Sequence, residues 1–332
     1  MKEKDHSLVS VIIPTRNRSQ LLSRALNSVL KQSYAPIEIL LIDDASEDDT
    51  ENELQTLRET DNRLYIFRNS RPLGGSASRN VGIKNAKGKF IAFLDDDDEW
   101  LEGKLEKQIN YLEQHEEVGA VSCWYIKEIG GKTQKVKKPL DIGFIDQLWE
   151  NYMGSFSFCT VRRDAIESIG LLDESLPGSQ DRDYWLRVTE KYRVAVIPDY
   201  LAIQHLHPLP RITTQSLGKV VGLERVYNKY SKYMSEECKN HILKYIYYYR
   251  SLSSQTVNGR VVNYFKMVKS LSLSRRDVMR FLYTTVSLCI PAQSGNRLRS
   301  YFMKRFIKEK PVIEYYDVYK KLHGANMQTG VV

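Results

Sequence analysis

The chain has 332 residues, which predicts about two domains at roughly 100–200 residues per domain. A hydrophobic content of 42% excludes a chain that is disordered throughout. The four cysteines are far apart and form no Cys-x-x-Cys pair, which disfavours a zinc knuckle or a disulfide framework. The polar start shows no secretory signal, and no apolar stretch reaches the roughly 20 residues that span a bilayer. We therefore expect a cytoplasmic protein.

Charge is distributed unevenly along the chain. Residues 1–210 hold 27 Lys and Arg against 34 Asp and Glu, a balance of −7, whereas residues 211–332 hold 22 against 7, a balance of +15. The acidic part is suited to metal binding, and the basic part to an anionic surface such as phospholipid, nucleic acid or a phosphorylated acceptor. We expect a domain boundary near residue 211, followed by a basic, helical C-terminal region.

Short apolar runs alternate with segments of helical spacing in the first part of the chain. Strands are expected at 9–13, 37–42, 64–67, 90–94 and 119–124, and helices at about 19–32, beyond 46, at 76–86 and at 101–114. Farther on, we expect a hairpin or loop at 130–131, a helix at 181–190 and a strand at 194–197. This alternation predicts an α/β fold with right-handed crossovers and a mostly parallel, Rossmann-like sheet flanked by helices.

Polar residues follow three of the expected strands at the point where each ends. They are Pro14-Thr15-Arg16-Asn17, Asp43-Asp44 and the run Asp95 to Asp98. Because ligands of open α/β sheets bind beyond the carboxyl ends of the strands, these residues are expected to share one rim.

The four consecutive aspartates call for a specific explanation, since neighbouring carboxylates repel one another. Hard oxygen ligands at the end of a strand suit Mg²⁺ or Mn²⁺, which would relieve this repulsion and leave positions open for a diphosphate. The alternative is a solvated acidic loop, or caps for the helix that begins near Trp100. The position of the run after a buried strand favours the metal site.

Two other features of the rim support anion and nucleoside binding. Asp44 could accept hydrogen bonds from a nucleoside, or could cap the helix that begins near Ser46. The stretch from Leu73 to Gly82 places glycines before a helix and Arg79 near its start, which is a ready anion site. Alone this stretch is a weak signal, because glycine commonly precedes a helix.

Six motifs in fixed order carry a resemblance to a known family. They are Val11-Ile-Ile-Pro-Thr-Arg-Asn17, Val29-Leu-Lys-Gln-Ser-Tyr34, Ile42-Asp-Asp-Ala-Ser46, Gly75 to Gly82, Gly88 to Trp100 and Gln180-Asp-Arg-Asp-Tyr-Trp-Leu-Arg187. Together they resemble the family 2 glycosyltransferases over about residues 8–210. The resemblance implies a GT-A fold and an inverting, nucleotide-sugar-dependent transferase. The C-terminal third carries no motif that can be assigned.

The resemblance also implies roles for individual residues. Asp95-x-Asp97 matches the family's DXD motif, with Asp97 as the metal ligand, and Asp96 stands where the family more often has serine. The residues expected to bind the nucleotide-sugar are Pro14, Thr15, Asn17, Asp44, Arg79, Asp95 and Asp96, with Asp44 facing the base.

A second carboxylate is expected to act as the catalytic base. Asp181 stands where the family has its base, although Gln180 replaces the usual preceding acid. An alcohol is a poor nucleophile, so a positioned carboxylate must take its proton during attack. Asp181 and Asp183 are two positions apart and so face different ways on a helix, and Asp181 is the one expected to face the cleft. The alternative is that Asp181 only caps the helix. By the same resemblance His207, or alternatively His205, completes the metal or diphosphate site.

The expected function is transfer of a sugar, from a UDP-sugar in particular, to a hydroxyl of a glycan or lipid-linked acceptor in bacterial-type cell-surface polysaccharide synthesis. The alternatives are a metal-dependent nucleotidyltransferase or a non-catalytic nucleotide-sugar-binding module. A nucleotidyltransferase would be expected to carry a glycine-rich loop after the first strand, and none stands there.

The basic C-terminal region suggests a surface role. Residues 275–310 combine a short apolar run with basic flanks and could lie in a lipid headgroup layer, at the inner face of the cell membrane. A core helix with a solvated basic face explains the same pattern. Residues 220–270 could serve oligomerisation, and no nucleic-acid module accompanies the charge.

Overall fold

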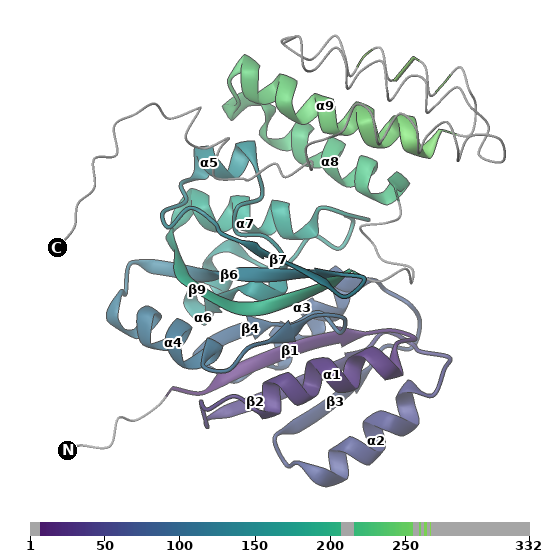
Figure 1. Ribbon diagram of the computed structural model, residues 1–332, viewed down its shortest axis with the longest axis vertical. Helices are drawn as coiled ribbons and strands as arrows, with labels where there is room; N and C mark the ends of the chain where they lie inside the picture. The colour runs from purple at the N-terminus through teal and green to yellow at the C-terminus, as the bar shows by residue number, and fades with distance from the viewer. Residues whose placement is uncertain (1–6, 207–215, 255–258, 260–261, 264–265, 267–332) are drawn as a thin grey trace. The chain divides into compact units, whose positions relative to one another are not determined.

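The computed structural model describes residues 7–206, 216–254, 259, 262–263 and 266 (Figure 1). The chain divides into two compact units, one made of residues 1–176 and 180–209 and the other of residues 177–179 and 210–332. His207 and the segment 275–310 lie outside the described residues.

The first unit is built on a nine-stranded sheet with the order β3-β2-β1-β4-β8-β6-β9-β5, in which β7 pairs with β6. Its first half is parallel throughout: β1 (Val9–Thr15) lies between β2 (Ile37–Asp43) and β4 (Phe90–Phe93), and β3 (Leu64–Arg68) forms the edge beside β2. The expected mostly parallel α/β sheet is therefore confirmed.

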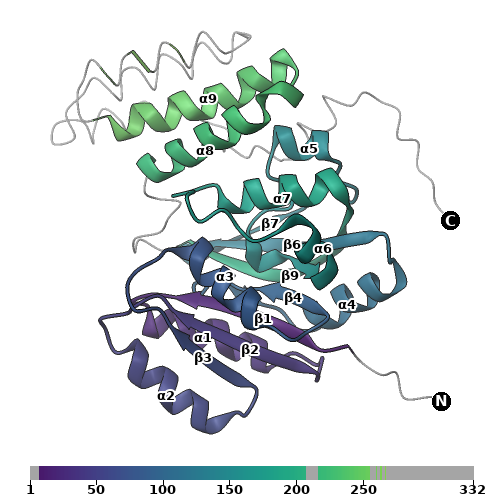
Figure 2. The same ribbon diagram turned by 180° about the vertical axis from the view of Figure 1, so that it is seen from behind.

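The helices of this half connect its parallel strands. Helices α1 (Ser19–Leu30) and α2 (Thr50–Thr60) connect the strands toward the β3 edge, and α3 (Gly75–Asn85) returns the chain from β3 to β4. Figures 1 and 2, seen from opposite sides, show α1 and α3 on opposite faces of the sheet. With both faces covered, all seven residues of β2 are buried, which is why this strand reads as a continuous apolar run.

Helix α3 packs closely on β1 because of a glycine. A Cβ atom added at Gly82 would lie 2.5 Å from Cγ2 of Ile12, a buried β1 residue. Only a residue without a side chain permits this approach. The contact places α3, and with it Arg79, against the strand that ends at Thr15.

The second half of the sheet contains antiparallel strands that the alternation did not predict. Its strands are β8 (Thr160–Arg162), β6 (Val118–Ile129), β9 (Arg193–Leu206), β5 (Glu99–Trp100) and β7 (Lys132–Val136). Strand β8 runs antiparallel to β4 and β6, and β5 antiparallel to β9, whereas β6 and β9 are parallel. The expected hairpin at 130–131 joins β6 to β7, and β9 extends well beyond the expected 194–197.

Four helices and a short 3₁₀ turn complete the described part of this unit. They are α4 (Lys104–Gln114), α5 (Phe144–Trp149), η1 (Phe156–Phe158), α6 (Arg163–Ile169) and α7 (Gln180–Lys191). Helix α4 buries Leu105, Ile109 and Leu112, which recur at helical spacing, as the sequence pattern predicts. Helix α7 buries Tyr184 and Trp185 completely.

The second unit is helical where it is described. Helices α8 (Ser216–Tyr230) and α9 (Glu236–Ser253), joined by η3 (Ser231–Tyr233), pack through apolar side chains that include Val226 and Ile242. Arg250 on α9 also pairs with Glu224 on α8 at 2.6 Å. Within the described residues, no helix combines the length and apolar character needed to cross a bilayer.

Candidate active site

The aspartate run lies in a tight turn between β4 and β5. The turn is closed by a hydrogen bond from the Asp98 amide to the Asp95 carbonyl, 3.1 Å long. One carboxylate oxygen from each of Asp95, Asp97 and Asp98 lies within 4.8 Å of the other two. Because Asp97 and Asp98 are buried, their charges cannot be screened by water. Three hard oxygen ligands at this spacing fit a divalent cation.

Two arginines, one at the N-cap of α1 and one within this helix, neutralise part of the acidic turn. Nη1 of Arg18 lies 2.7 Å from Oδ1 of Asp96 and 3.2 Å from Oδ2 of Asp97. Nη2 of Arg24 donates to the backbone carbonyl of Asp97 at 2.8 Å. Sequence reasoning did not single out either arginine, since each lies more than 70 residues from its partner.

Asp96 is set apart from the three clustered carboxylates. Its Oδ2 accepts a hydrogen bond from the hydroxyl of Thr15 at 2.8 Å, and its Oδ1 faces Arg18. Burial raises the pKa of Asp96 to about 6, and the charge of Asp97 adds to this rise, whereas Arg18 opposes it. Thr15 and Asp96, both expected at the nucleotide-sugar site, are thus joined to each other across the rim.

The other rim residues of β1 have different surroundings. Pro14 is half-buried within the strand, opposite Ile42 of β2. Asn17 is exposed, adopts a φ of 53°, and accepts a hydrogen bond from the Glu47 amide on its Oδ1. Its own amide donates to Ser46. Asn17 therefore connects the loops that follow β1 and β2.

The Asp44 carboxylate accepts hydrogen bonds from the loop that precedes α3. Its Oδ1 accepts from Nδ2 of Asn69 at 2.7 Å and from the Leu73 amide at 2.8 Å, and its Oδ2 accepts from the Gly74 amide at 2.8 Å. The side chain does not cap the helix near Ser46, where Asp43 accepts from the Ser46 amide instead. Asp44 thus fixes the turn that leads into α3.

Arg79 brings a positive charge from α3 to the acidic turn. It pairs with Asp95, and its Nη1 donates to the Gly75 carbonyl at 3.0 Å. The guanidinium lies over the ring of Phe156, 4.6 Å from the ring centre. The guanidinium is buried, and its ion pair with Asp95 offsets part of the cost of removing it from water.

Asp181 lies in the first turn of α7 and is half-buried. Its Oδ2 accepts from Nδ2 of Asn151 at 2.8 Å, and its Oδ1 accepts from the Arg182 amide. Burial raises the pKa of Asp181, and the charge of Asp95 raises it further, while the hydrogen bonds and Arg79 lower it. Asp183 is buried and bonds to Arg187 on the same helix, 3.0 Å away.

A segment missed by sequence reasoning connects these carboxylates. Asn151 reaches Asp181, and four residues later the hydroxyl of Ser155 donates to Oδ2 of Asp95 at 3.0 Å. The hydroxyl of Ser157 accepts from the Asp95 amide at 3.1 Å. The segment lies in an irregular part of the sequence, where no periodic pattern marks these residues.

His205 stands near the end of β9 between two glutamates. Its Nε2 lies 3.1 Å from Glu99 and its Nδ1 3.3 Å from Glu128. Among the described residues, it does not belong to the group of potential metal ligands. The preferred candidate, His207, falls outside them.

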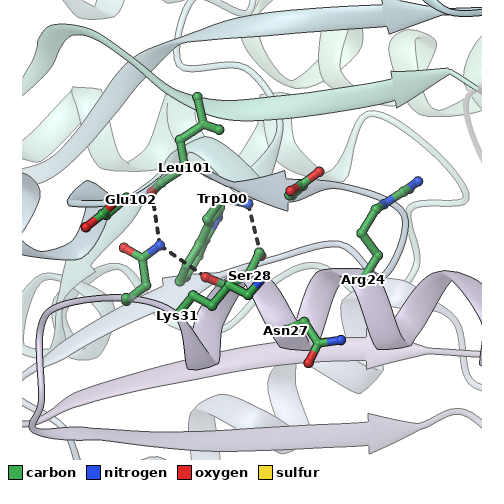
Figure 3. Close-up of a pocket in the computed structure, with 9 residues that line it drawn as sticks. Arg24, Asn27, Ser28, Lys31, Trp100, Leu101 and Glu102 are labelled. Atoms are coloured by element: carbon green, nitrogen blue, oxygen red, sulfur yellow. Dashed lines mark hydrogen bonds between the residues drawn. The ribbon is translucent and has the colours of Figure 1, made fainter.

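A cleft of about 580 Å³ lies between α1 and the segment 99–102. Figure 3 shows Arg24, Ser28 and Lys31 on α1 and, across from this helix, the segment that carries Trp100, Leu101 and Glu102. The Trp100 amide donates to the Ser28 hydroxyl across it. The cleft adjoins the acidic turn through Arg24, but its lining includes none of the residues Asp95 to Asp98.

Comparisons with known proteins agree with this geometry. The family model described as Glycosyl transferase family 2 matches residues 10–170. A curated relative, the UDP-Glc:α-D-GlcNAc-diphosphoundecaprenol β-1,3-glucosyltransferase WfaP of Escherichia coli, is 31% identical over 188 residues, which are 55% of this chain and 71% of the relative.

Two solved structures share the fold. The TarS fragment 1–349 of S. aureus has a TM-score of 0.58 and 17% identity, with 82% of this chain and 83% of that chain covered. The mannosyltransferase PcManGT of Pyrobaculum calidifontis, solved with GDP-Man and Mn²⁺, has a TM-score of 0.55 and 16% identity, over 90% of this chain and 85% of that chain. The resemblance read from the motifs is therefore confirmed, and with it an enzyme rather than a binding module or a nucleotidyltransferase: the chain belongs to the family 2 glycosyltransferases.

Proposed function

We propose that this glycosyltransferase moves a hexosyl group, with inversion, from a UDP-sugar to a hydroxyl of a lipid-linked glycan in cell-surface polysaccharide synthesis. Asp181 is the proposed base. The donor and acceptor classes follow those of the relative WfaP, a transferase that is named for UDP-glucose and a diphosphoundecaprenol-linked GlcNAc. Residues 1–210 form the proposed catalytic domain.

The observation that carries the assignment is the arrangement of the two carboxylate sites. Asp181 lies within the electrostatic reach of Asp95, and one short segment contacts both side chains. A base and a donor site must be neighbours for an acceptor hydroxyl bound at the base to reach the anomeric carbon of the donor. Asp183 is a weaker candidate for the base, because it is buried and paired with Arg187 on its own helix.

In the proposed reaction, Asp181 takes the proton of the acceptor hydroxyl as the hydroxyl oxygen attacks the anomeric carbon. The bond from that carbon to the diphosphate oxygen breaks, and UDP leaves. A single displacement inverts the anomeric configuration and needs no protein nucleophile. The raised pKa of Asp181, caused by burial, makes it a stronger base than an exposed aspartate.

The donor half of the proposed site is the acidic turn with its arginines. Asp95, Asp97 and Asp98 would hold Mn²⁺ or Mg²⁺, which would offset the charge of the diphosphate. Arg79 holds Asp95 in place, and Thr15 holds Asp96. Pro14, Asn17 and Asp44 shape the rim on which the nucleoside is proposed to rest.

The proposed acceptor places the enzyme at the inner face of the cell membrane. The balance of +15 over residues 211–332 suits an anionic lipid surface, and the proposed contact is the segment 275–310. Peripheral binding of this kind would bring the catalytic domain to a lipid-linked substrate. Oligomerisation through residues 220–270 remains the alternative use of the region.

The test of this function is transfer from UDP-glucose to a synthetic GlcNAc-diphosphate lipid with Mn²⁺. Asp181→Asn should reduce transfer by about 10²–10⁴-fold, the usual contribution of a general base, while the affinity for UDP stays within about twofold. Glu190→Gln, an exposed change on the same helix, is the control and should keep full activity. Full transfer by Asp181→Asn would overturn the assignment of the base.

A further inference from the structure

We infer that Asn151 is the positioning residue of the base, holding the Asp181 carboxylate in its reactive orientation and tying it to the acidic turn. The inference deepens the proposed function and rests on the role proposed there for Asp181. It starts from the hydrogen bond that Nδ2 of Asn151 donates to Oδ2 of Asp181, 2.8 Å long. Asn151 lies two residues after the end of α5, whereas Asp181 lies in the first turn of α7, so tertiary structure alone brings them together.

The orientation of the Asn151 amide is determined by its other contacts. Its Oδ1 accepts from Nε2 of Gln147 at 2.7 Å and from the Gly154 amide at 3.2 Å. Both partners are donors toward Asn151, so an inverted amide would lose both bonds and would present an oxygen to the carboxylate. Gln147 is itself fixed, because it is fully buried and its Oε1 accepts from the Met153 amide. The amide N–H groups of Asn151 must therefore face Asp181.

The carboxylate of Asp181 is consequently held at both oxygens. The Arg182 amide donates to Oδ1, and Asn151 donates to Oδ2. Donors to a carboxylate favour its ionised form, which is the form that accepts a proton from an alcohol. A carboxylate held in this way also keeps the direction of its remaining lone pairs, which a base needs in order to meet the hydroxyl.

The same segment fixes the base relative to the donor site. Four residues after Asn151, Ser155 donates to Asp95, which belongs to the acidic turn. The chain between them turns at Gly154, where φ is 76°, and the carbonyl of Gly154 accepts from the Trp185 indole on α7 at 2.8 Å. The segment 151–155 therefore acts as a rigid spacer between the two carboxylate sites.

A buried lysine, Lys138, donates a hydrogen bond to the backbone of the segment 151–155. Nζ of Lys138 donates to the carbonyl of Met153 at 2.7 Å and to the hydroxyl of Ser122 at 2.8 Å. The charged groups that act on Asp181 are Asp95, which disfavours its ionised form, and Arg79 and Lys138, which favour it. Asn151 is the neutral side chain that contacts it directly.

Two variants of Asn151 separate positioning from folding. Asn151→Ala removes the donor. Asn151→Asp is isosteric and keeps an acceptor for Gln147 and Gly154, but it places a second carboxylate against Asp181. Both should lower kcat by about 10–100-fold, the value of a hydrogen bond to a charged group, and leave the affinity for UDP within about twofold. Asn85→Ala, at an exposed asparagine of α3, is the matched control.

The pH profile of kcat/KM supplies the readout that a merely structural role would not move. Loss of the donor raises the pKa of Asp181, so the acid limb should shift to higher pH in Asn151→Ala and farther in Asn151→Asp. An unchanged acid limb in the folded Asn151→Asp variant would overturn the inference, even if Asn151→Ala failed to fold. If Asp181→Asn retained full transfer, the proposed base would fail instead, so the two failures are distinguishable.

Discussion

Replacing Asp44 by alanine should destabilise the first unit, because this carboxylate holds the turn before α3. The variant loses three hydrogen bonds, from Asn69, Leu73 and Gly74. At about 1.5 kcal/mol for each bond to a charged group, the upper bound is about 4–5 kcal/mol. Leu73 and Gly74 are exposed, so water can satisfy their amides, and Asn69 retains a bond to Ser78. We expect a net loss of about 1.5–3 kcal/mol.

Thermal unfolding, followed by circular dichroism, measures this loss. For a unit of this size, 1 kcal/mol corresponds to about 2–4 °C, so the midpoint of Asp44→Ala should fall by about 3–12 °C. Affinity for UDP, measured by calorimetry, should fall as well, because the turn leads into the helix that carries Arg79. Glu47→Gln, at an exposed residue three positions farther on, is the control and should change neither quantity.

The result that would refute this reasoning is a variant with a wild-type midpoint and weakened UDP binding. Asp44 would then act through the nucleoside alone, and its three hydrogen bonds to the protein would contribute no net stability. A lowered unfolding midpoint with unchanged UDP affinity would show that Asp44 contributes to stability and not to nucleotide binding.

Two further predictions concern charged groups of the first unit. Arg18→Gln should lower the free energy of unfolding in EDTA by about 1–3 kcal/mol, because it leaves the buried carboxylates of Asp96 and Asp97 without this partner. Mn²⁺ should raise the unfolding midpoint of this variant more than that of the wild type. An equal rise in the two proteins would contradict this prediction. Burial lowers the pKa of Lys138 to about 8, below its unfolded value of 10.5. Between these pH values the unfolded chain binds more protons, so the contribution of this lysine to stability increases as pH rises. In urea unfolding, the free energy of unfolding of the wild type should therefore rise relative to that of Lys138→Met from pH 7.5 to pH 9.5. A difference that stays constant over this range would contradict the lowered pKa of Lys138.

The parallel half of the sheet could be predicted from the sequence for a physical reason. Its inner strands are covered by helices on both faces, so apolar runs such as Ile37–Asp43 stand out against the helical spacing of Leu22, Ala25 and Val29. The short strands could not be predicted. Strands β5 and β8 have two and three residues, too few for a pattern, and they exist because β9 and β4 offer them pairing edges.

The candidate site likewise contains residues that could be predicted from the sequence and residues that could not. The aspartates of the DXD motif and Arg79 could be placed on one rim, since parallel strands end at the same edge of a sheet. The amino acids that surround them could not. Arg18 meets Asp96 across 78 positions of sequence, and Ser155 meets Asp95 across 60. No local pattern encodes contacts over such separations.

By itself, the sequence determined the α/β class, the rim of the sheet and the identity of the acidic motif, because burial and strand ends leave periodic and local marks on a chain. Only the tertiary structure decided that Asp44 secures a loop, that Asp96 turns to Thr15 and Arg18, and that Asn151 faces Asp181. These outcomes depend on which donor each carboxylate meets once the helices and strands have packed, and a carboxylate takes whatever donors that packing places within its reach.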